Sequence, residues 1–504
     1  MQRRAFLAGT AALAATRRED AHAEAKAGVL RVSCYSDITS FDPMTGRSGD
    51  DHIQLYTLYD TLVGYDFKTL QAVPGLATGW RFPDPRTLVL DLRTDVAFHD
   101  GTPFDAAAAV FNLDRIRSHP RSNIKADVAS IEAAEATGTH QVTLRLKQPD
   151  TALPLILADR AGMMVSPAAV AKSDNIDRAP VGTGMMRFVA WRDKESTVVA
   201  RNDAYWRRGL PKLDGIRFTV ISDTQTGLRS VSTGENDFIY ALTPQQLAVA
   251  RRSRGLAASS SPTLYCQQLY FNRKQGPLQD LRVRQAVNHA IDRDAYNKGS
   301  ALGVFEVADT LLPREHWAYS PVPPGGRYPH DPAKARALLA EAGFAEGVEL
   351  NLILYSDQSS QQRAEILIEQ FRPAGIRLRL SSAALPEATA QFFQAGQGDM
   401  LLSAWTGRPD PTLSYALMFG TGAFYNASRL GTPELDEAIQ QTRLSSDQAE
   451  RARAFARVQA MVLDQALWAP LVFQSQVVAQ GARVQGYAPT LLGKPRFDGV
   501  SVAG

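Results

Sequence analysis

Short runs of strand-like residues, several with alternating polar and apolar positions, recur along the first half of the chain. A period of two places successive side chains on opposite faces of a sheet. Between these runs apolar residues follow a helical spacing. In one such segment Asp105 is the expected cap, and Val110, Leu113 and Ile116 form the buried stripe. The predicted strands cover 29–34, 88–92, 142–146, 186–191, 196–200, 215–221 and 238–241, and the predicted helices cover 53–62, 105–116 and 224–233.

The second half continues this mixture and adds a βαβ unit. A strand is predicted over 349–355, a helix over 363–371 and a strand over 376–380, the order found in parallel sheets. Because the N-terminal block has no C-terminal boundary of its own, we expect α/β lobes in which the chain leaves one lobe and returns to it. Further strands are predicted over 263–272, 400–402 and 471–478, and further helices after the caps Asp280 and Asp331 and over 434–442 and 448–464.

A turn after the apolar run 400–402 carries residue types that suit ligand binding. One glycine and two prolines between 407 and 411 disfavour both helix and ladder pairing, so the chain must turn there. Trp405, Arg408 and Asp410 are crowded onto this turn. Trp offers a flat apolar face, and Arg offers a fork of donors that suits a carboxylate. The turn is therefore a candidate binding loop; the alternative is an Arg–Asp surface pair beside a core Trp.

The first 23 residues have the features of an export signal. Arg3 and Arg4 form a basic start, 5–16 is a short apolar segment, and 21–23 (Ala-His-Ala) is a small-x-small cleavage site. The segment is too short to span a membrane, and no cysteine lies near the cleavage point to carry a lipoprotein anchor. Residues 3–7 also resemble the twin-arginine motif, although ordinary secretory signals often begin with two basic residues. We expect a periplasmic protein cleaved near Ala23.

Composition narrows the function classes. The chain has 504 residues, 44% hydrophobic and 21% charged, which fits about three globular domains. Removing 1–23 lowers the Lys and Arg count from 55 to 51 and the Asp and Glu count from 52 to 50. A charge near +1 argues against a nucleic-acid partner. The two cysteines, Cys34 and Cys266, are too few for a metal cluster, and the sequence leaves their pairing open.

A series of short motifs follows in order along the mature chain. They are Phe41-Asp42-Pro43, 58–63 (Leu-Tyr-Asp-Thr-Leu-Val), 74–80 (Pro-Gly-Leu-Ala-Thr-Gly-Trp), 92–103 (Leu-Arg-Thr-Asp-Val-Ala-Phe-His-Asp-Gly-Thr-Pro), 181–184 (Val-Gly-Thr-Gly), 201–206 (Arg-Asn-Asp-Ala-Tyr-Trp), and 270–272 (Tyr-Phe-Asn) with 282–291. Together they resemble the large extracytoplasmic solute-binding proteins of ABC transporters, the oligopeptide-, dipeptide- and nickel-binding group. Each motif is short, so it is their shared order that carries the resemblance.

This resemblance implies a periplasmic-binding-protein-like clamshell, two α/β lobes with an extra middle domain, that closes over its ligand by hinge bending. It also implies a membrane permease with paired ATPases as partners, and a monomer without cofactor or nucleic acid. The expected divisions are a signal peptide 1–23, a first lobe made of 24–65, 178–265 and 470–504, a middle domain 66–177 and a second lobe 266–469.

The sequence departs from the dipeptide-binding members of this group at two places. Such relatives typically have an Asp directly after Trp-Thr-Gly, where it holds the ligand's α-amino group, but Arg408 occupies that place here. They also hold the ligand carboxylate with an Arg before a helix that here starts near Gln361, where 356–360 reads Ser-Asp-Gln-Ser-Ser. Because a desolvated ion needs an opposite partner, the reversed charge favours an anionic group. We predict a small peptide-like or carboxylate-bearing ligand, with Arg408 as its main contact.

The other candidate ligand contacts are Trp405, Asp410, Tyr35, Asp37, Thr183 and Tyr265. Tyr35 and Asp37 leave the first strand toward the expected cleft, Thr183 lies in a Gly-Thr-Gly loop, and Tyr265 lies on a strand near the hinge. Each has a structural alternative. Trp405 and Tyr265 suit the core, and Tyr35 and Asp37 suit plain loop positions.

Two other functions stay open on the sequence. A metal such as nickel, bound as a chelate, would leave no ligand pattern in the chain. The eight histidines have no metal-ligand spacing, so no metal site is predicted, and His99 is interpreted as the residue that holds the turn of a His-Asp-Gly motif. An exported hydrolase is the second alternative, but the sequence lacks Gly-x-Ser-x-Gly and His-Glu-x-x-His. We therefore expect a binding protein and not an enzyme.

Overall fold

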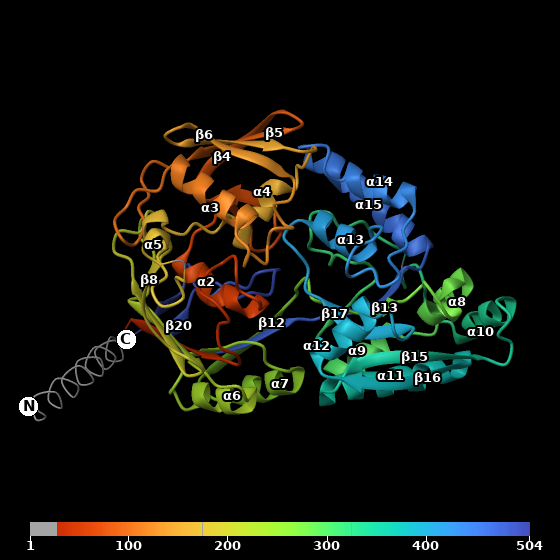
Figure 1. The fold of residues 1–504 in the computed structure, drawn as a ribbon. Helices are drawn as coiled ribbons and strands as arrows, with labels where there is room; N and C mark the ends of the chain where they lie inside the picture. The colour runs from red at the N-terminus through yellow and green to blue at the C-terminus, as the bar shows by residue number, and fades with distance from the viewer. Residues whose placement is uncertain (1–27, 174, 324, 504) are drawn as a thin grey trace, which may run out of the picture.

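Two large β-sheets, one four-stranded sheet and two small two-stranded sheets, with helices packed on the larger ones, make up the described part of the chain (Figure 1). The computed structural model describes residues 28–173, 175–323 and 325–503. The predicted signal segment and its cleavage point near Ala23 lie outside these residues. Among the helices described, none is long and apolar enough to cross a membrane.

The first lobe is built on a seven-stranded sheet with the order β12-β19-β11-β1-β10-β9-β8. Its helices α6 (Thr224–Ser232) and α7 (Pro244–Arg252) pack on the sheet at the bottom of Figure 1. Because β19 comes from the C-terminal part of the chain, the chain does return to this sheet. The strands are β1 (Val29–Cys34), β8 (Met186–Arg192), β9 (Ser196–Arg201), β10 (Gly215–Val220), β11 (Phe238–Ile239), β12 (Leu256–Ser261) and β19 (Gln476–Gly481).

The second lobe is built on a six-stranded sheet with the order β14-β18-β13-β17-β15-β16. Strands β15 (Val348–Tyr355) and β16 (Ile376–Ala383) are parallel and are joined by α11 (Gln358–Phe371), so the predicted βαβ unit is confirmed. The remaining elements are β13 (Cys266–Phe271), β14 (Glu306–Val307), β17 (Met400–Trp405), β18 (Trp468–Phe473), α8 (Leu281–His289), α9 (Arg293–Ala301), α10 (Pro332–Glu341), α12 (Leu385–Thr389), α13 (Pro411–Phe419), α14 (Pro433–Gln441) and α15 (Gln448–Asp464).

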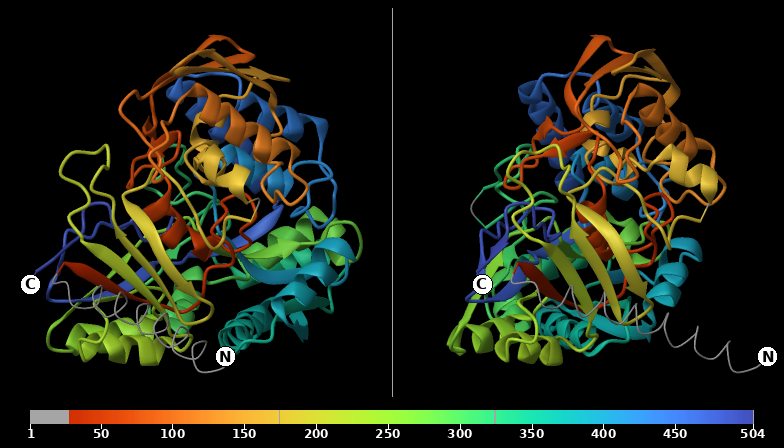
Figure 2. Two further views of the ribbon diagram at one scale, coloured as in Figure 1. Left: turned by 60° about the vertical axis from the view of Figure 1, so that its left-hand side comes forward. Right: turned by 90° about the vertical axis from the view of Figure 1, so that its left-hand side faces the viewer.

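A smaller unit with a four-stranded antiparallel sheet, in the order β4-β5-β7-β6, lies at the top of Figure 1. Its apolar side chains belong to the same core as those of the first lobe. It also lies beside the second lobe, where the Thr151 N–H and hydroxyl donate to the Arg443 carbonyl at 3.0 and 2.9 Å; Figure 2 shows this side of the molecule. Its elements are β4 (Ala77–Asp84), β5 (Thr87–Leu92), β6 (Ile131–Gly138), β7 (Gln141–Leu146), α3 (Ala106–Ser118), α4 (Leu153–Ile156) and α5 (Pro167–Lys172).

Two crossings connect the large sheets, and both fall inside segments that the sequence predicts as single strands. The predicted strand 471–478 is wrong as one element, because the chain leaves β18 after Phe473 and enters β19 at Gln476. The predicted strand 263–272 joins its sheet only from Cys266 onward. At the crossing the Thr263 hydroxyl donates to the Gln474 carbonyl at 2.6 Å, and the Gln474 N–H donates to the Tyr265 carbonyl at 2.7 Å. The two connections therefore run side by side as a paired hinge.

The two cysteines lie in different sheets. Cys34 ends β1 in the first lobe, and Cys266 begins β13 in the second. Both thiols are free and buried. Burial raises the pKa of each thiol to about 12, so both are protonated packing groups.

Candidate ligand-binding cleft

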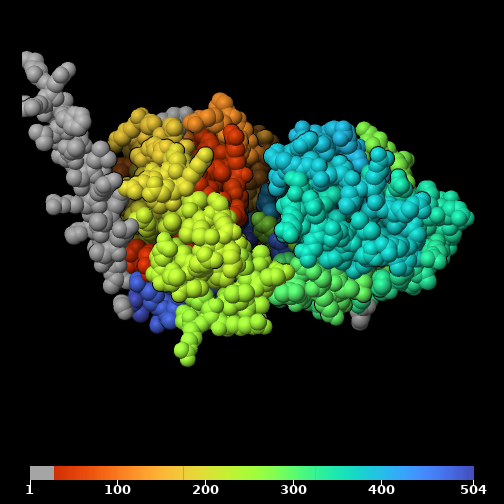
Figure 3. All heavy atoms as spheres, turned by 90° about the horizontal axis from the view of Figure 1, so that it is seen from below, coloured from red at the N-terminus to blue at the C-terminus, as the bar shows by residue number. Residues whose placement is uncertain are grey.

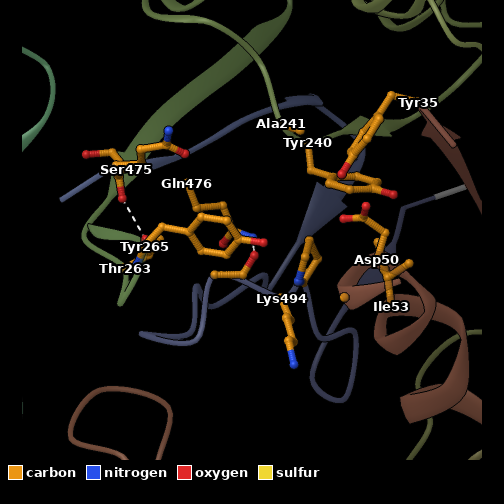
Figure 4. A pocket seen from close by; sticks show the side chains of 14 residues that line it. Tyr35, Asp50, Ile53, Tyr240, Ala241, Thr263, Tyr265, Ser475, Gln476 and Lys494 are labelled. Atoms are coloured by element: carbon orange, nitrogen blue, oxygen red, sulfur yellow. Dashed lines mark hydrogen bonds between the residues drawn. The ribbon is translucent and has the colours of Figure 1, made fainter. Parts of the chain in front are cut away.

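A pocket lies beside the hinge crossings, and its lining comes from the first lobe and from these crossings. Figure 3 shows the groove between the two lobes. Its volume of about 170 Å³ is small beside the roughly 300–1,000 Å³ of a pocket for a whole drug-sized molecule. The pocket therefore suits one end of a ligand. It is lined by Tyr35, Gly49, Asp50, Ile53, Tyr240, Ala241, Thr263, Tyr265, Gln474, Ser475, Gln476, Gly493, Lys494 and Pro495 (Figure 4).

Three tyrosines form the aromatic wall of this pocket. Tyr35 follows β1, Tyr240 follows β11, and their ring centroids are 5.6 Å apart. Tyr265 comes from the hinge crossing, and its hydroxyl oxygen would lie 3.9 Å from a Cβ placed on Gly49. Burial, with the nearby charge of Asp50, raises the pKa of Tyr265 to about 12 and also raises the pKa of Tyr35. All three rings therefore remain neutral and present both a π-face and a hydroxyl group.

The acidic residue of the pocket, Asp50, lies in the short 3-10 helix Gly49–Asp51, which the neighbouring Asp51 carboxylate holds in place. Asp51 is fully buried and accepts from the Thr39 N–H at 2.8 Å, the Thr39 hydroxyl at 2.6 Å and Arg160 at 3.1 Å. The Ser48 hydroxyl accepts from the Asp50 N–H at 3.1 Å and donates to the Asp50 carboxylate at 3.2 Å. These bonds fix the backbone, and the Asp50 carboxylate faces the pocket.

A cluster of Lys494, His52 and Asp159 lies at one side of the pocket. The Lys494 Nζ lies 3.1 Å from His52 Nε2 and 3.6 Å from Asp159, and His52 Nδ1 donates to the Gly49 carbonyl at 2.9 Å. Burial lowers the pKa of Lys494 to about 8 and that of His52 to about 4. The Lys494 charge is already paired with Asp159, so this lysine is a weaker anion site than an unpaired cation would be.

Arg408 is the cation at the cleft without an ion-pair partner among the described residues. Its guanidinium donates to the Gly407 carbonyl at 2.9 Å and lies over the Trp405 ring at 5.3 Å. Burial raises the pKa of Asp127, between α3 and β6 of the unit with the four-stranded sheet, to about 6, and the nearby Arg408 charge opposes this rise. The same charge opposes the rise in the pKa of Tyr265. Arg408 therefore acts electrostatically on groups of both the hinge and this smaller unit.

Trp405 is 4% exposed and supports the loop. Its indole N–H donates to the Ser414 hydroxyl at 3.0 Å, and its ring packs edge-on against Tyr425 at 5.2 Å. A buried ring with its N–H satisfied offers little surface to a ligand. Its place under the guanidinium indicates that Trp405 positions Arg408 through a cation–π contact.

Asp410 differs from its expected placement, because its carboxylate is occupied inside the second lobe. It is 1% exposed, accepts from Arg451 at 2.8 and 3.0 Å, and caps α13 by accepting from the Thr412 N–H at 2.9 Å. A buried carboxylate held by a buried arginine is a structural pair; here one Arg451 nitrogen contacts both carboxylate oxygens. We therefore leave Asp410 out of the proposed site.

Asp37 and Thr183 are also used by the fold. The Asp37 carboxylate accepts from the Trp191 indole at 3.2 Å and from the Lys194 N–H at 2.7 Å, which ties β1 to the β8–β9 hairpin. Thr183 is 1% exposed, and its hydroxyl accepts from the Asp60 N–H at 3.3 Å. Neither residue lines the pocket, so of the six secondary candidates the pocket contains Tyr35 and Tyr265.

His99 holds its turn, as the sequence indicates. Its Nε2 donates to the Gly184 carbonyl at 2.9 Å, and its Nδ1 accepts from the Gly182 N–H at 3.3 Å. Burial lowers the pKa of His99 to about 4. In the described parts of the chain there is no group of three or more His, Cys, Asp or Glu side chains placed to hold a metal ion.

Comparison with known proteins identifies the family. A model of bacterial extracellular solute-binding proteins, family 5, matches residues 71–426. The glutathione-binding protein GsiB of Salmonella paratyphi A is 30% identical over 474 residues, which cover 90% of this chain and 91% of GsiB. The chain belongs to family 5 of the bacterial extracellular solute-binding proteins.

Solved structures agree with this family assignment. NikA from Brucella suis, in complex with Fe(III)-EDTA, superposes with a TM-score of 0.83 at 26% identity, covering 94% of this chain and 99% of NikA. HbpA2 from Haemophilus parasuis has the same fold, with a TM-score of 0.83 at 22% identity over 94% and 99% of the two chains. The predicted α/β periplasmic-binding-protein fold is confirmed. As a family 5 solute-binding protein, the chain is the substrate-binding component of an ABC importer, which works with a permease and an ATPase.

Sequence reasoning missed Asp50, Tyr240 and Lys494. No motif surrounds them, and they come from segments far apart in the chain. The sequence offered one local signal, the two adjacent acids Asp50 and Asp51. Two neighbouring side chains point in different directions, so one of the two carboxylates can face outward while the other is buried. Which of the two points outward depends on Arg160 and Thr39, so the sequence could suggest the pair but not the choice.

Proposed function

We propose that this family 5 protein binds a small peptide-like solute through a carboxylate and delivers it chemically unchanged to the permease. Arg408 is the main contact, and Trp405 positions it. The mature protein starts near Glu24 after export to the periplasm and works as a monomer, without nucleic acid.

The observation that carries the proposal is the Arg408 guanidinium, which has no carboxylate at ion-pair distance in the described chain. A guanidinium is a fork of donors that matches a carboxylate in two parallel bonds. Because desolvation on lobe closure penalises an unpaired charge, a ligand that supplies the opposite charge favours the closed form. Glutathione, the ligand in the name of GsiB, is a small peptide with carboxylates and supports this choice.

Mass spectrometry under native conditions tests the proposal on the purified mature protein, followed by calorimetry with glutathione, dialanine and trialanine and with the alkyl ester of each. We expect an intact carboxylate-bearing solute to bind. Arg408→Ala should weaken the free acid about 10- to 100-fold, the size of a lost hydrogen-bonded charge contact, and should change ester binding little. Arg408→Lys should recover part of the loss.

Arg372→Ala is the matched control, because Arg372 is an exposed second-lobe arginine paired with Glu369. It should leave affinity unchanged. Equal binding of acid and ester, or equal affinity in the parent and Arg408→Ala, would contradict the role of Arg408. Elemental analysis of the same sample tests the alternative that the ligand is a metal chelate. A metal bound in stoichiometric amount would support the chelate in place of a free peptide.

A further inference from the structure

Asp50 presents a carboxylate to the pocket wall without a cationic partner at ion-pair distance in the described chain. Its carboxylate accepts a hydrogen bond from the Ser48 hydroxyl at 3.2 Å and also interacts with the neutral Tyr35 hydroxyl. Lys494, on the same pocket, is held 3.1 Å from His52 and 3.6 Å from Asp159 instead. A carboxylate in a half-enclosed pocket without a cationic partner gains most from a ligand that brings a positive charge.

The aromatic wall favours the same kind of group. Tyr35 and Tyr240 lie together on the Asp50 side of the pocket, and the Tyr265 hydroxyl points toward that side (Figure 4). Tyrosine faces attract an ammonium through the ring quadrupole, and their hydroxyl oxygens accept hydrogen bonds from it. The Asp50 carboxylate and the three neutral tyrosines therefore offer an ammonium group several hydrogen-bond acceptors and a negative electrostatic potential.

The two ends of the cleft carry opposite unpaired charges. Tyr265 lies between them. Burial makes the largest contribution to the raised pKa of its hydroxyl group, the Asp50 charge raises this pKa further, and the Arg408 charge lowers it, so both charges are near the same hydroxyl group. Arg408 does not line the small pocket itself. A ligand end that fills the pocket must therefore extend past Tyr265 to reach the guanidinium.

We infer that the pocket binds the ligand's ammonium group on Asp50, with Tyr35, Tyr240 and Tyr265 around it, and that the imported solute is a zwitterion. This rests on the proposed function, in which Arg408 holds the carboxylate. It adds a second determinant of specificity: a solute with a blocked amine is excluded even when its carboxylate is free.

The test compares each probe with its N-acetyl form by calorimetry, using glutathione, dialanine and trialanine. The wild-type protein should bind the free amine about 10- to 100-fold more tightly than the N-acetyl form. Asp50→Asn, which keeps the side-chain size and the Ser48 bond, should lower affinity for the free amine by a similar factor and leave N-acetyl binding unchanged. Glu235→Gln, which removes an exposed first-lobe charge away from the pocket, should change neither.

The outcomes separate the two proposals. If the wild-type protein binds free and N-acetyl probes equally, or Asp50→Asn weakens both forms equally, the ammonium site is overturned, while the carboxylate role of Arg408 stands. If no carboxylate-bearing probe binds in any form, the proposed function fails and this inference fails with it. The wild-type comparison needs no variant, so it decides the point even if Asp50→Asn does not fold.

Discussion

Two short loops, one in each lobe, both carry a charge that the protein pairs and a charge that it leaves unpaired. In the second lobe Asp410 is buried against Arg451 at 2.8 Å, while Arg408, two residues earlier, has no carboxylate partner in the described chain. In the first lobe Asp51 is buried against Arg160 at 3.1 Å, while Asp50, its direct neighbour, faces the pocket. In each loop a structural charge and a candidate binding charge are almost adjacent in sequence.

The difference teaches how to separate a functional charge from a structural one. A charge taken out of water must find its partner inside the protein, so Asp51 and Asp410 are held by several donors. A charge left at a cleft without such donors keeps its binding capacity for a ligand. These structural charges should govern stability, and the unpaired ones should govern affinity.

The largest effect that would sharpen this comparison is expected from Asp410→Ala. The substitution leaves Arg451 buried without its carboxylate and removes the cap of α13. The free energy of unfolding should fall by about 3–5 kcal/mol. Urea unfolding followed by circular dichroism measures it, with Asp464→Ala as the control. The Arg327–Asp464 pair is more than half exposed on both sides, so its loss should stay within about 1 kcal/mol. A similar small loss in Asp410→Ala would contradict its structural role.

The next effect is a dependence of stability on pH that comes from His99, whose two ring nitrogens are both hydrogen-bonded in the fold. Burial lowers the pKa of His99 from the ordinary 6.5 of a histidine to about 4 in the folded protein. Between these values the unfolded chain takes up a proton that the folded one does not. Stability is therefore lost as pH falls from about 6.5 toward 4, by at most about 1.4 kcal/mol per pH unit for this group.

His99→Gln tests this sign. It should lower stability at pH 7, because a bond to the Gly182 or Gly184 backbone is lost, and it should flatten the pH dependence between 6.5 and 4. His330→Gln, at an exposed position beside Asp292, is the control. Unfolding curves at a series of pH values give both slopes. A variant as steep as the wild type would show that His99 does not take part in this proton uptake.

The smallest effect is expected from the unpaired charges themselves. In the ligand-free protein Arg408→Ala and Asp50→Asn should each change the free energy of unfolding by no more than about 0.5 kcal/mol, because neither half-buried charge has an ion-pair partner in the described chain to lose. The same urea experiment measures them beside Asp410→Ala. A loss as large as that of Asp410→Ala would mean that the charge has a structural partner, and the comparison between the two loops would break.

Local features of the fold were readable from the sequence. The caps Asp105 and Asp331 each bond the expected backbone N–H, and the βαβ unit over 348–383 has the predicted order. The hydrophobic period of a strand or a helix is visible within a few residues, so these elements can be predicted without knowing what the rest of the chain does. The split of 471–478 into β18 and β19 was not readable, because alternation does not say which sheet a strand joins.

The sequence by itself determined the α/β elements, the order of the family motifs and the presence of Arg408 after Trp-Thr-Gly. Tertiary structure alone decided which candidate groups remain available. Asp37 is taken up by Trp191, 154 residues away, and Asp410 by Arg451, 41 residues away, while Asp50 keeps an unpaired carboxylate among three tyrosines. The physical reason is that a buried charge is satisfied by the donors that fold against it, and donors so distant along the chain reach it only when its lobe has formed.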